Sequence, residues 1–407
     1  MILIECFSSS HIDNINACLR LHPQEMILIG DTDAMCDPIA RYEALLQQRN
    51  QATKITPYDI RRKDLPDLCV ALHQLLQADD SYTIDLTGGD ELVIMAVGAV
   101  LSRLDHAKRS TIRIEKYDHK EDVVRDCVHN NQIICTNSVQ LTVAELVALH
   151  GGCLHTGGYQ PPSYHHPRDI EGLWQLASQD PKQWNDQISL LNRLERGCRA
   201  QQQIHKTVSS QRETMKDFDE SEPQLRALLQ ELDRRGAIQD QSSRDSFRYS
   251  YHSPLLHQCT AKAGNVLEIK TLLEGRQVKH NGAPYFGECQ MGVSIDWDGH
   301  IHKPSEDVSD TRNEIDAIFI RGTTPLFVSC KNGHIDDSEL YKLNTVAQRF
   351  GGLYAKKMLI ATDLDQKDAS ADRAFSQRAW DMDIFLVEDA ATLSKEEWQL
   401  IFHQAMQ

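Results

Sequence analysis

The sequence lacks several signatures that would place it in a familiar class. Its eleven cysteines are scattered and form no CxxC pair, which favours free thiols in a reducing cytoplasm over a disulfide framework. No GxGxxG motif is present, which argues against a dinucleotide cofactor. The longest apolar run, LVIMAVGAVL, has about half the length of a membrane span, and the N-terminal MILIECF has no basic region of a signal peptide. The sequence therefore predicts a cytoplasmic protein without a membrane contact.

Positive charge is also scarce. Lysine and arginine number 43 against 59 aspartate and glutamate residues, and the formal net charge is −16. Such a polyanion is repelled by nucleic acid unless local basic groups and metal ions offset the field. Any contact with DNA or RNA must therefore be local.

The length of 407 residues predicts two or three domains. Up to about residue 117, short β-branched runs alternate with amphipathic helical segments, a pattern typical of βαβ units. We therefore expect an α/β protein that begins with a Rossmann-like parallel sheet. A helix over 139–152 and a proline-rich stretch place the end of this domain near residue 158.

Residues 159–262 are expected to form a helical connector. Within it, residues 221–236 begin with Ser221 and Gln224 at capping-box spacing and carry leucines on one face. Together with the strand-like FRYSY that follows, this segment could be a winged-helix-like module or a plain packing element. Residues 263–407 return to alternating strands and helices, which predicts a second α/β domain with a mixed sheet.

The stretch NEIDAIFIRGTTPLFVSCKNG, residues 313–333, has the pattern of a β-hairpin. A type II′ turn at Gly322-Thr323 would place Asp316 opposite Ser329 and Glu314 opposite Lys331. Because side chains alternate between the faces of a strand, all four would converge on one patch.

Carboxylates beside a lysine suit hydrolysis of a phosphodiester. Carboxylate oxygens hold a hard cation such as Mg²⁺ or Mn²⁺, which activates water, and a lysine can stabilise the developing charge. Glu268, on the preceding predicted helix, offers a further carboxylate, and Asp296 and Asp298 are additional candidates. A solvated pair on a sheet edge is the alternative for Asp316 and Lys331.

Two loops of the first domain form a second candidate site. Thr87, Gly88 and Gly89 separate a strand from a helix, where backbone amides can approach a phosphate. Residues 8–10, three serines, and His11 follow the first strand and would lie at the same edge of the sheet. Cys153, His155, His165 and His166 lie close in sequence but lack a zinc spacing, so we expect a histidine-bearing loop there.

The acid on one strand and the lysine on the next resemble the PD-(D/E)xK nuclease superfamily, and GNVLE resembles the helix that often supplies its additional glutamate. The resemblance implies that Asp316 is the central metal ligand, Lys331 the catalytic lysine and Glu268 the helix acid. Ser329 stands where the pattern has an acid, so Glu268 or Glu314 would complete the metal shell.

A Rossmann-like half with DLTGG before a helix resembles the CARF domain, the CRISPR-associated Rossmann fold. Joined to the C-terminal half, it is similar to the CARF nucleases of type III CRISPR defence. This resemblance implies a homodimer that binds a cyclic oligoadenylate, commonly the tetra-adenylate, and then cleaves DNA, RNA or both. The ligand contacts would come from Ser8, Ser9, Ser10, His11, Thr87, Gly88 and Gly89. Many relatives have Thr-Lys after the glycines, whereas Asp90 and Glu91 follow here.

Two other functions remain open. One is a restriction or repair nuclease without second-messenger control, and the other is a non-catalytic sensor or transcription regulator in which Ser329 marks a decayed site.

Overall fold

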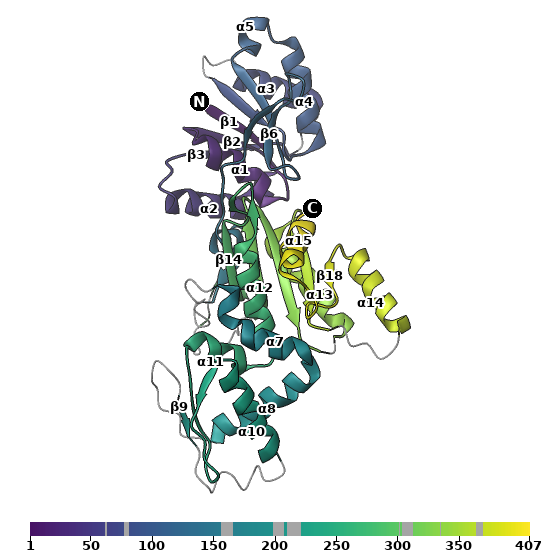
Figure 1. Cartoon of the computed structure of the whole chain (residues 1–407). Coiled ribbons are helices and arrows are strands. Elements are labelled where there is room, and N and C mark those ends of the chain that lie inside the picture. Colours follow the sequence, from purple (N-terminus) through teal and green to yellow (C-terminus); the bar gives the residue numbers. More distant parts are fainter. Residues whose placement is uncertain are drawn as a thin grey trace.

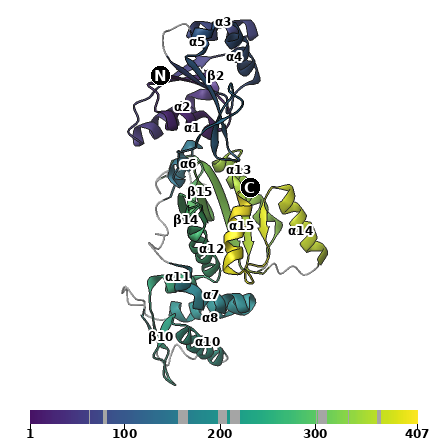
Figure 2. The same cartoon turned by 45° about the horizontal axis from the view of Figure 1, so that its top comes forward.

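The computed structural model describes residues 1–61, 63–76, 81–155, 166–197, 207–209, 221–300, 302, 312–333, 335–363 and 369–407. The chain is elongated, with the N-terminal sheet at one end, the C-terminal sheet in the middle and a helical part at the other end (Figure 1). A second view shows the same succession of parts (Figure 2). Among the residues described, no helix is both long and apolar enough to span a bilayer.

The N-terminal sheet has seven strands in the order β3-β2-β1-β4-β5-β6-β7. The strands β1 to β5 run parallel, and β6 and β7 are antiparallel additions. The strands are β1 Ile2–Cys6, β2 Glu25–Gly30, β3 Lys54–Asp59, β4 Tyr82–Asp85, β5 Ile112–Asp118, β6 Val123–Asp126 and β7 Ile133–Thr136. The helices are α1 His11–Leu21, α2 Thr32–Gln48, α3 Leu65–Leu75, α4 Glu91–Arg103 and α5 His106–Arg109.

This strand order creates a topological switch point between β1 and β4. The chain leaves β1 toward β2 on one side and leaves β4 toward β5 on the other, so the loops after these two strands both lie at the switch point. Asp90 caps α4 by accepting a hydrogen bond from the amide of Leu92, which fixes where the second loop ends. The predicted Rossmann-like sheet is confirmed.

The C-terminal sheet has six strands in the order β18-β17-β16-β15-β14-β8. Pairing is antiparallel from β8 to β16 and parallel from β16 to β18, which confirms the predicted mixed sheet. The strands are β8 Cys153–Leu154, β14 Glu288–Asp296, β15 Arg312–Arg321, β16 Thr324–Lys331, β17 Lys356–Ala361 and β18 Phe385–Val387, with the separate pair β12 Lys279–His280 and β13 Ala283–Pro284. The helices are α12 Asn265–Gln277, α13 Asp337–Gly351, α14 Ala369–Asp381 and α15 Lys395–Ala405.

The two faces of this sheet belong to different hydrophobic cores. Apolar residues of α12 and α15 share a core with the helical part, and those of α13 and α14 lie in the core on the opposite face. The hairpin β15–β16 lies at the centre of the sheet and has the predicted register, since Arg321 pairs with Thr324 and Ala317 with Val328. Gly322 has a φ of 60°, as the first central residue of a type II′ turn requires.

The helical part packs on α12. It contains η1 Pro167–Ile170, α7 Glu171–Gln179, α8 Pro181–Gly197, β9 Thr207–Ser209, α10 Glu222–Arg234, β10 Ile238–Asp240, β11 Arg248–Tyr251 and α11 Pro254–Ala261. The predicted helix and strand over 221–251 are present as α10 and β11, and β11 is the middle strand of a small antiparallel sheet. The predicted capping box is wrong: Ser221 has helical backbone angles and its side chain makes no capping hydrogen bond.

One hydrophobic core joins the N-terminal and C-terminal sheets. It runs from Leu3 and Ile12 through the helix α6, Val143–Leu149, to Ile295 and Phe350. Arg49, the C-cap residue of α2, reinforces this junction through an ion pair of 2.7 Å with Glu145. Residues 153–154 form β8 on the C-terminal sheet, whereas the proposed boundary near residue 158 lies outside the described residues.

Candidate active site and activator loops

The hairpin brings the four predicted side chains to one cavity. Glu314 and Asp316 of β15 and Ser329 and Lys331 of β16 all line a cavity of about 70 Å³, which α13 closes on its far side. Cys330 points into the opposite core, as the alternation of strand side chains predicts. Burial raises the pKa of its thiol well above the ordinary value, so Cys330 is a core residue here.

Asp316 is held in place by the neighbouring strand. Its Oδ2 accepts a hydrogen bond of 2.6 Å from the backbone amide of Cys330 and one of 3.3 Å from Ser329 Oγ. Burial raises the pKa of Asp316, while these hydrogen bonds and the charge of Lys331 oppose the rise. One carboxylate oxygen is thus fixed to the hairpin, and Ser329 contributes a hydroxyl where an acid was expected.

Glu268 of α12 interacts electrostatically with the carboxylates of this cavity. Its pKa is raised to about 7 by burial and by the negative charges of Asp316 and Glu314. Glu268 does not line the cavity itself. A partly buried carboxyl whose ionisation is opposed by two others is a group that a cation would stabilise in its charged form.

Lys331 has a partner that the sequence analysis did not identify. Its Nζ lies 2.7 Å from Oε2 of Glu339, a residue in the first turn of α13. Burial lowers the pKa of Lys331, but the hydrogen bond that Lys331 donates to Glu339 and the charge of Asp316 outweigh this effect, and the pKa is raised. Lys331 is therefore held as a cation. A sequence signal was available, because the short connection from β16 to α13 returns the acidic start of the helix to the end of the strand.

The chemistry of this donor set suits a hard divalent cation, but the ligand count is low. Asp316 and Glu268 offer carboxylate oxygens, which Mg²⁺ and Mn²⁺ prefer. Within the described ranges, no group of three or more histidine, cysteine, aspartate or glutamate side chains is placed to hold one ion. Ser329 Oγ, backbone carbonyls and water would have to supply the remaining positions.

The other candidates from the sequence lie apart from this cavity. Asp296 ends β14 and is fully buried, and Asp298 accepts a hydrogen bond of 2.9 Å from the amide of His300, as in a turn. Cys153 lies in β8, whereas His165 falls outside the described residues.

The two loops that are predicted to bind the cyclic oligoadenylate, residues 8–11 and 87–89, are called the activator loops, and they meet at the switch point of the N-terminal sheet. Gly88 lies so close to the first loop that a Cβ at this position would be 2.8 Å from the Cβ and Oγ of Ser8. Gly89 has a φ of 115° and packs on Cys6, so a side chain there is excluded as well. The two glycines are what allow the loops to pack against each other.

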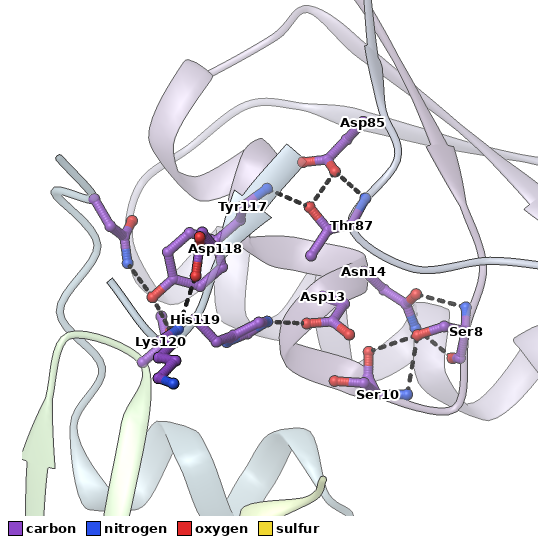
Figure 3. Close-up of polar contacts among 12 residues, drawn as sticks. Ser8, Ser10, Asp13, Asn14, Asp85, Thr87, Tyr117, Asp118, His119 and Lys120 are labelled. Atoms are coloured by element: carbon purple, nitrogen blue, oxygen red, sulfur yellow. Dashed lines mark hydrogen bonds and ion pairs between the residues drawn. The ribbon is translucent and has the colours of Figure 1, made fainter. Parts of the chain in front are cut away.

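Hydrogen bonds order the first loop internally (Figure 3). The amide of Ser8 donates to Asn14 Oδ1 at 2.8 Å, and Ser8 Oγ accepts from the amide of Ser10 at 3.0 Å. Ser9 is exposed and Ser10 is buried. His11 Nδ1 lies 2.9 Å from the hydroxyl of Tyr42, and burial together with the charge of His150 lowers the pKa of His11 to about 3. His11 is therefore neutral at physiological pH.

Thr87 belongs to a buried polar network (Figure 3). Its amide and hydroxyl both donate to Asp85 Oδ1, and its Oγ1 accepts from the amide of Tyr117 at 2.8 Å. Burial raises the pKa of Asp85 to about 7, although the hydrogen bonds from Thr87 oppose the rise. Any ligand that reached the Thr87 hydroxyl would act on this network.

Fold and site together define a two-sheet α/β protein in which a Rossmann-like domain packs on a mixed-sheet domain that presents carboxylates and a lysine from one hairpin. Among solved structures, the chain is similar to protein VC1899 from Vibrio cholerae, with a TM-score of 0.71 and 16% identity over 99% of this chain and 97% of that one. It is also similar to Can2 from Sulfobacillus thermosulfidooxidans in complex with cyclic tetra-adenylate, with a TM-score of 0.65 and 15% identity over 100% and 97% of the two chains. No protein-family model and no curated protein matches the sequence. The predicted resemblance to the CARF nucleases is thus confirmed at the level of the fold.

Proposed function

We propose that this protein is a metal-dependent nuclease that cyclic oligoadenylate, most simply the tetra-adenylate, switches on. The observation that carries the proposal is the convergence of Asp316, Ser329 and Lys331 on one cavity, and the charges of Asp316 and Glu314 also raise the pKa of Glu268 on α12. The likeness over the full chain to Can2 in complex with cyclic tetra-adenylate supports the choice of activator.

The residues of the site have distinct roles in this proposal. Asp316 and Glu268, with Glu314 at the rim, would hold Mg²⁺ or Mn²⁺, which when bound supplies an activated water and neutralises phosphate charge. Lys331, kept protonated by Glu339, stabilises the negative charge that develops on the phosphate. Ser329 keeps Asp316 oriented through its hydrogen bond.

The activator would bind at the switch point of the N-terminal sheet. Ser8, Ser9, Ser10 and His11 in one loop and Thr87, Gly88 and Gly89 in the other are the proposed contacts, with backbone amides facing phosphates. A ring with internal symmetry fits a two-fold interface, so we propose a homodimer in which each subunit binds half of the ligand.

A non-catalytic sensor is the second candidate. It is favoured by Ser329 at the position of an expected acid and by the absence, among the described residues, of three side chains placed around one ion. A nuclease without second-messenger control is the third reading.

One experiment separates these functions. Purified full-length protein is incubated with plasmid, single-stranded DNA and RNA, with and without cyclic tetra-adenylate and Mn²⁺. We expect cleavage that needs both additions and that Asp316→Asn abolishes. Cleavage that is the same with and without the cyclic nucleotide would support a nuclease without second-messenger control. Tight binding of the nucleotide without any cleavage would support the non-catalytic sensor.

A further inference from the structure

One residue reaches from the activator loop to the tip of the catalytic hairpin. Tyr117 of β5 donates its backbone N–H to Thr87 Oγ1 at 2.8 Å. Its side-chain oxygen lies 3.3 Å from Oγ1 of Thr323, the second central residue of the β15–β16 turn. Tyr117 and Thr323 are both buried, at 2% and 1% exposure. Tyr117 therefore links Thr87 to the hairpin turn, through its backbone N–H on one side and its hydroxyl on the other.

The same tyrosine hydroxyl is fixed on its other sides. It donates to Asp122 Oδ1 at 2.7 Å and accepts from Asn137 Nδ2 at 3.3 Å. The hairpin turn is held as well, because the amide of Leu141 donates to the carbonyl of Gly322 at 2.9 Å. Polar contacts of this kind are directional and weaken steeply with small displacements, unlike the apolar packing around them.

A second contact starts two residues further along the chain. His119 Nε2 lies 2.6 Å from Oδ1 of Asp13, and the imidazole stacks on Tyr354 with ring centroids 3.5 Å apart and an interplanar angle of 15°. Asp13 lies beside Gly88, since a Cβ built on the glycine would be 3.5 Å from the Asp13 Cβ. Tyr354 precedes β17, the strand that pairs with β16 over Ser329 and Lys331.

Both contacts start near the end of β5. Figure 3 shows the backbone N–H of Tyr117 directed to Thr87 Oγ1 and the side chain of His119 directed to Asp13. On the C-terminal side, Thr323 is separated from Asp316 by about 20 Å of strand that is paired with its neighbours in the sheet. The turn after β5 is thus placed between the activator loops and the strand that carries Asp316.

We propose that Tyr117 and His119 are positioning residues that couple occupancy of the activator loops to the geometry of the catalytic hairpin. This inference rests on the proposed function, because it assigns the regulation of that same site. The activator can shift the equilibrium toward the active arrangement only to the extent that it binds that arrangement more tightly than the inactive one. We infer that the contacts of Tyr117 and His119 connect the two sites.

The test compares Tyr117→Phe, Thr323→Val and the double variant with the wild type, all as full-length protein. Each single change removes one hydroxyl and keeps the shape of the side chain. Tyr249→Phe is the matched control, since it removes a buried tyrosine hydroxyl that donates to Glu195 at 3.0 Å in the helical part. Cleavage without activator, maximal cleavage with cyclic tetra-adenylate, and the Kd of that nucleotide are measured for each protein.

In the two single variants, we expect the maximal stimulation of cleavage by cyclic tetra-adenylate to be about tenfold smaller than in the wild type. Basal cleavage should be unchanged, and the Kd of the nucleotide should be unchanged or lower. A lower Kd follows because binding no longer has to shift the hairpin, and a general loss of structure would raise it instead. The double variant should lose no more than Tyr117→Phe alone, since Tyr117→Phe already removes the contact with Thr323 together with those to Asp122 and Asn137. Thr323→Ser, which restores the hydroxyl, should recover stimulation.

Stimulation at the wild-type level in both single variants, or additive losses in the double variant, would overturn the coupling through Tyr117 while leaving the nuclease in place. A wild type that binds no cyclic tetra-adenylate, or that is not stimulated by it, would instead overturn the proposed function. The two failures are therefore distinguishable in one set of measurements.

Discussion

Lys331 Nζ lies 2.7 Å from Glu339 Oε2, so the lysine of the hairpin is anchored by the first turn of the next helix. Both side chains line the cavity that also contains Asp316. The ion pair fixes the lysine in the place where phosphate charge would develop, and it makes α13 a part of the candidate site. These contacts, and the packing of the two N-terminal loops, have measurable consequences.

Glu339→Gln should lower kcat of metal-dependent cleavage by about tenfold with little effect on KM, because Lys331 is no longer held in place. The matched control is Lys342→Gln, which removes the exposed second partner of Glu339 and should change kcat less than twofold, on the order of a surface pair. Equal effects of the two variants would contradict a specific role for the Lys331 contact.

The ion pair of Lys331 and Glu339 should also contribute to the free energy of unfolding. The pKa of Glu339 is lowered by Lys331 and Lys342 against the opposing effect of burial, so its contribution is present above its ordinary pKa of 4.5 and is lost as the pH falls below it. At pH 7 we expect Glu339→Gln to lower the free energy of unfolding by about 1 kcal/mol. In urea denaturation this difference should shrink as the pH is lowered toward 3.

The contribution of Glu268 to stability should have the opposite pH dependence. Its pKa of about 7 lies above the ordinary 4.5, so its contribution to stability declines as the pH rises from 4.5 to 7. Glu268→Gln should therefore be more stable than the wild type at pH 8, by roughly 2 kcal/mol, and similar to it near pH 4.5. Denaturation at these two pH values, without added metal, measures the difference.

Binding of Mn²⁺ should depend on the same titration. A cation binds the charged form of Glu268, so metal affinity of the wild type should rise through pH 7 and become flat above it. Glu268→Gln should bind Mn²⁺ more weakly and without this pH dependence. Calorimetry at pH 6 and pH 8 tests both statements, and a pH-independent wild type would remove Glu268 from the metal site.

Ser329→Asp places a carboxylate opposite Asp316, where the nuclease pattern has one. The added acid should raise the affinity for Mn²⁺ about tenfold, because a charged oxygen replaces a neutral one. Without metal, the like charges should destabilise the protein by about 1–2 kcal/mol. Ser329→Ala is the control and should change Mn²⁺ affinity only slightly. If Ser329→Asp left the affinity unchanged, this position would lie outside the metal shell.

Gly88→Ala should weaken the binding of cyclic tetra-adenylate by about tenfold, because the new Cβ meets Ser8 and pushes the two loops apart. Gly98→Ala is the matched control, since a Cβ on that exposed position of α4 meets nothing within 4 Å. It should leave binding unchanged and stabilise the helix by about 0.5–1 kcal/mol. Equal binding by both variants would show that the loop contact does not shape the ligand site.

The sequence was sufficient to predict the sheets and the hairpin, because apolar strands, a Gly-Thr turn and strict alternation determine register and face. Glu339 as the partner of Lys331 was missed, although the short connection between β16 and the acidic start of α13 was a usable signal. The contact of Tyr117 with Thr323 joins residues 206 positions apart and has no local pattern. The error at Ser221 has a local cause: a capping residue needs extended backbone angles, and here φ is −102° and ψ is −4°.

The apolar core shared by the two sheets has a consequence for how such a protein can be divided or rebuilt. Leu3 and Phe350, from opposite ends of the chain, belong to one continuous buried cluster. A fragment cut after residue 150 would carry the α6 face of that cluster into water and would be prone to associate with itself. Fusion of the N-terminal domain to a different partner domain would accordingly require a recipient with a complementary apolar surface, and a flexible linker could not replace that surface.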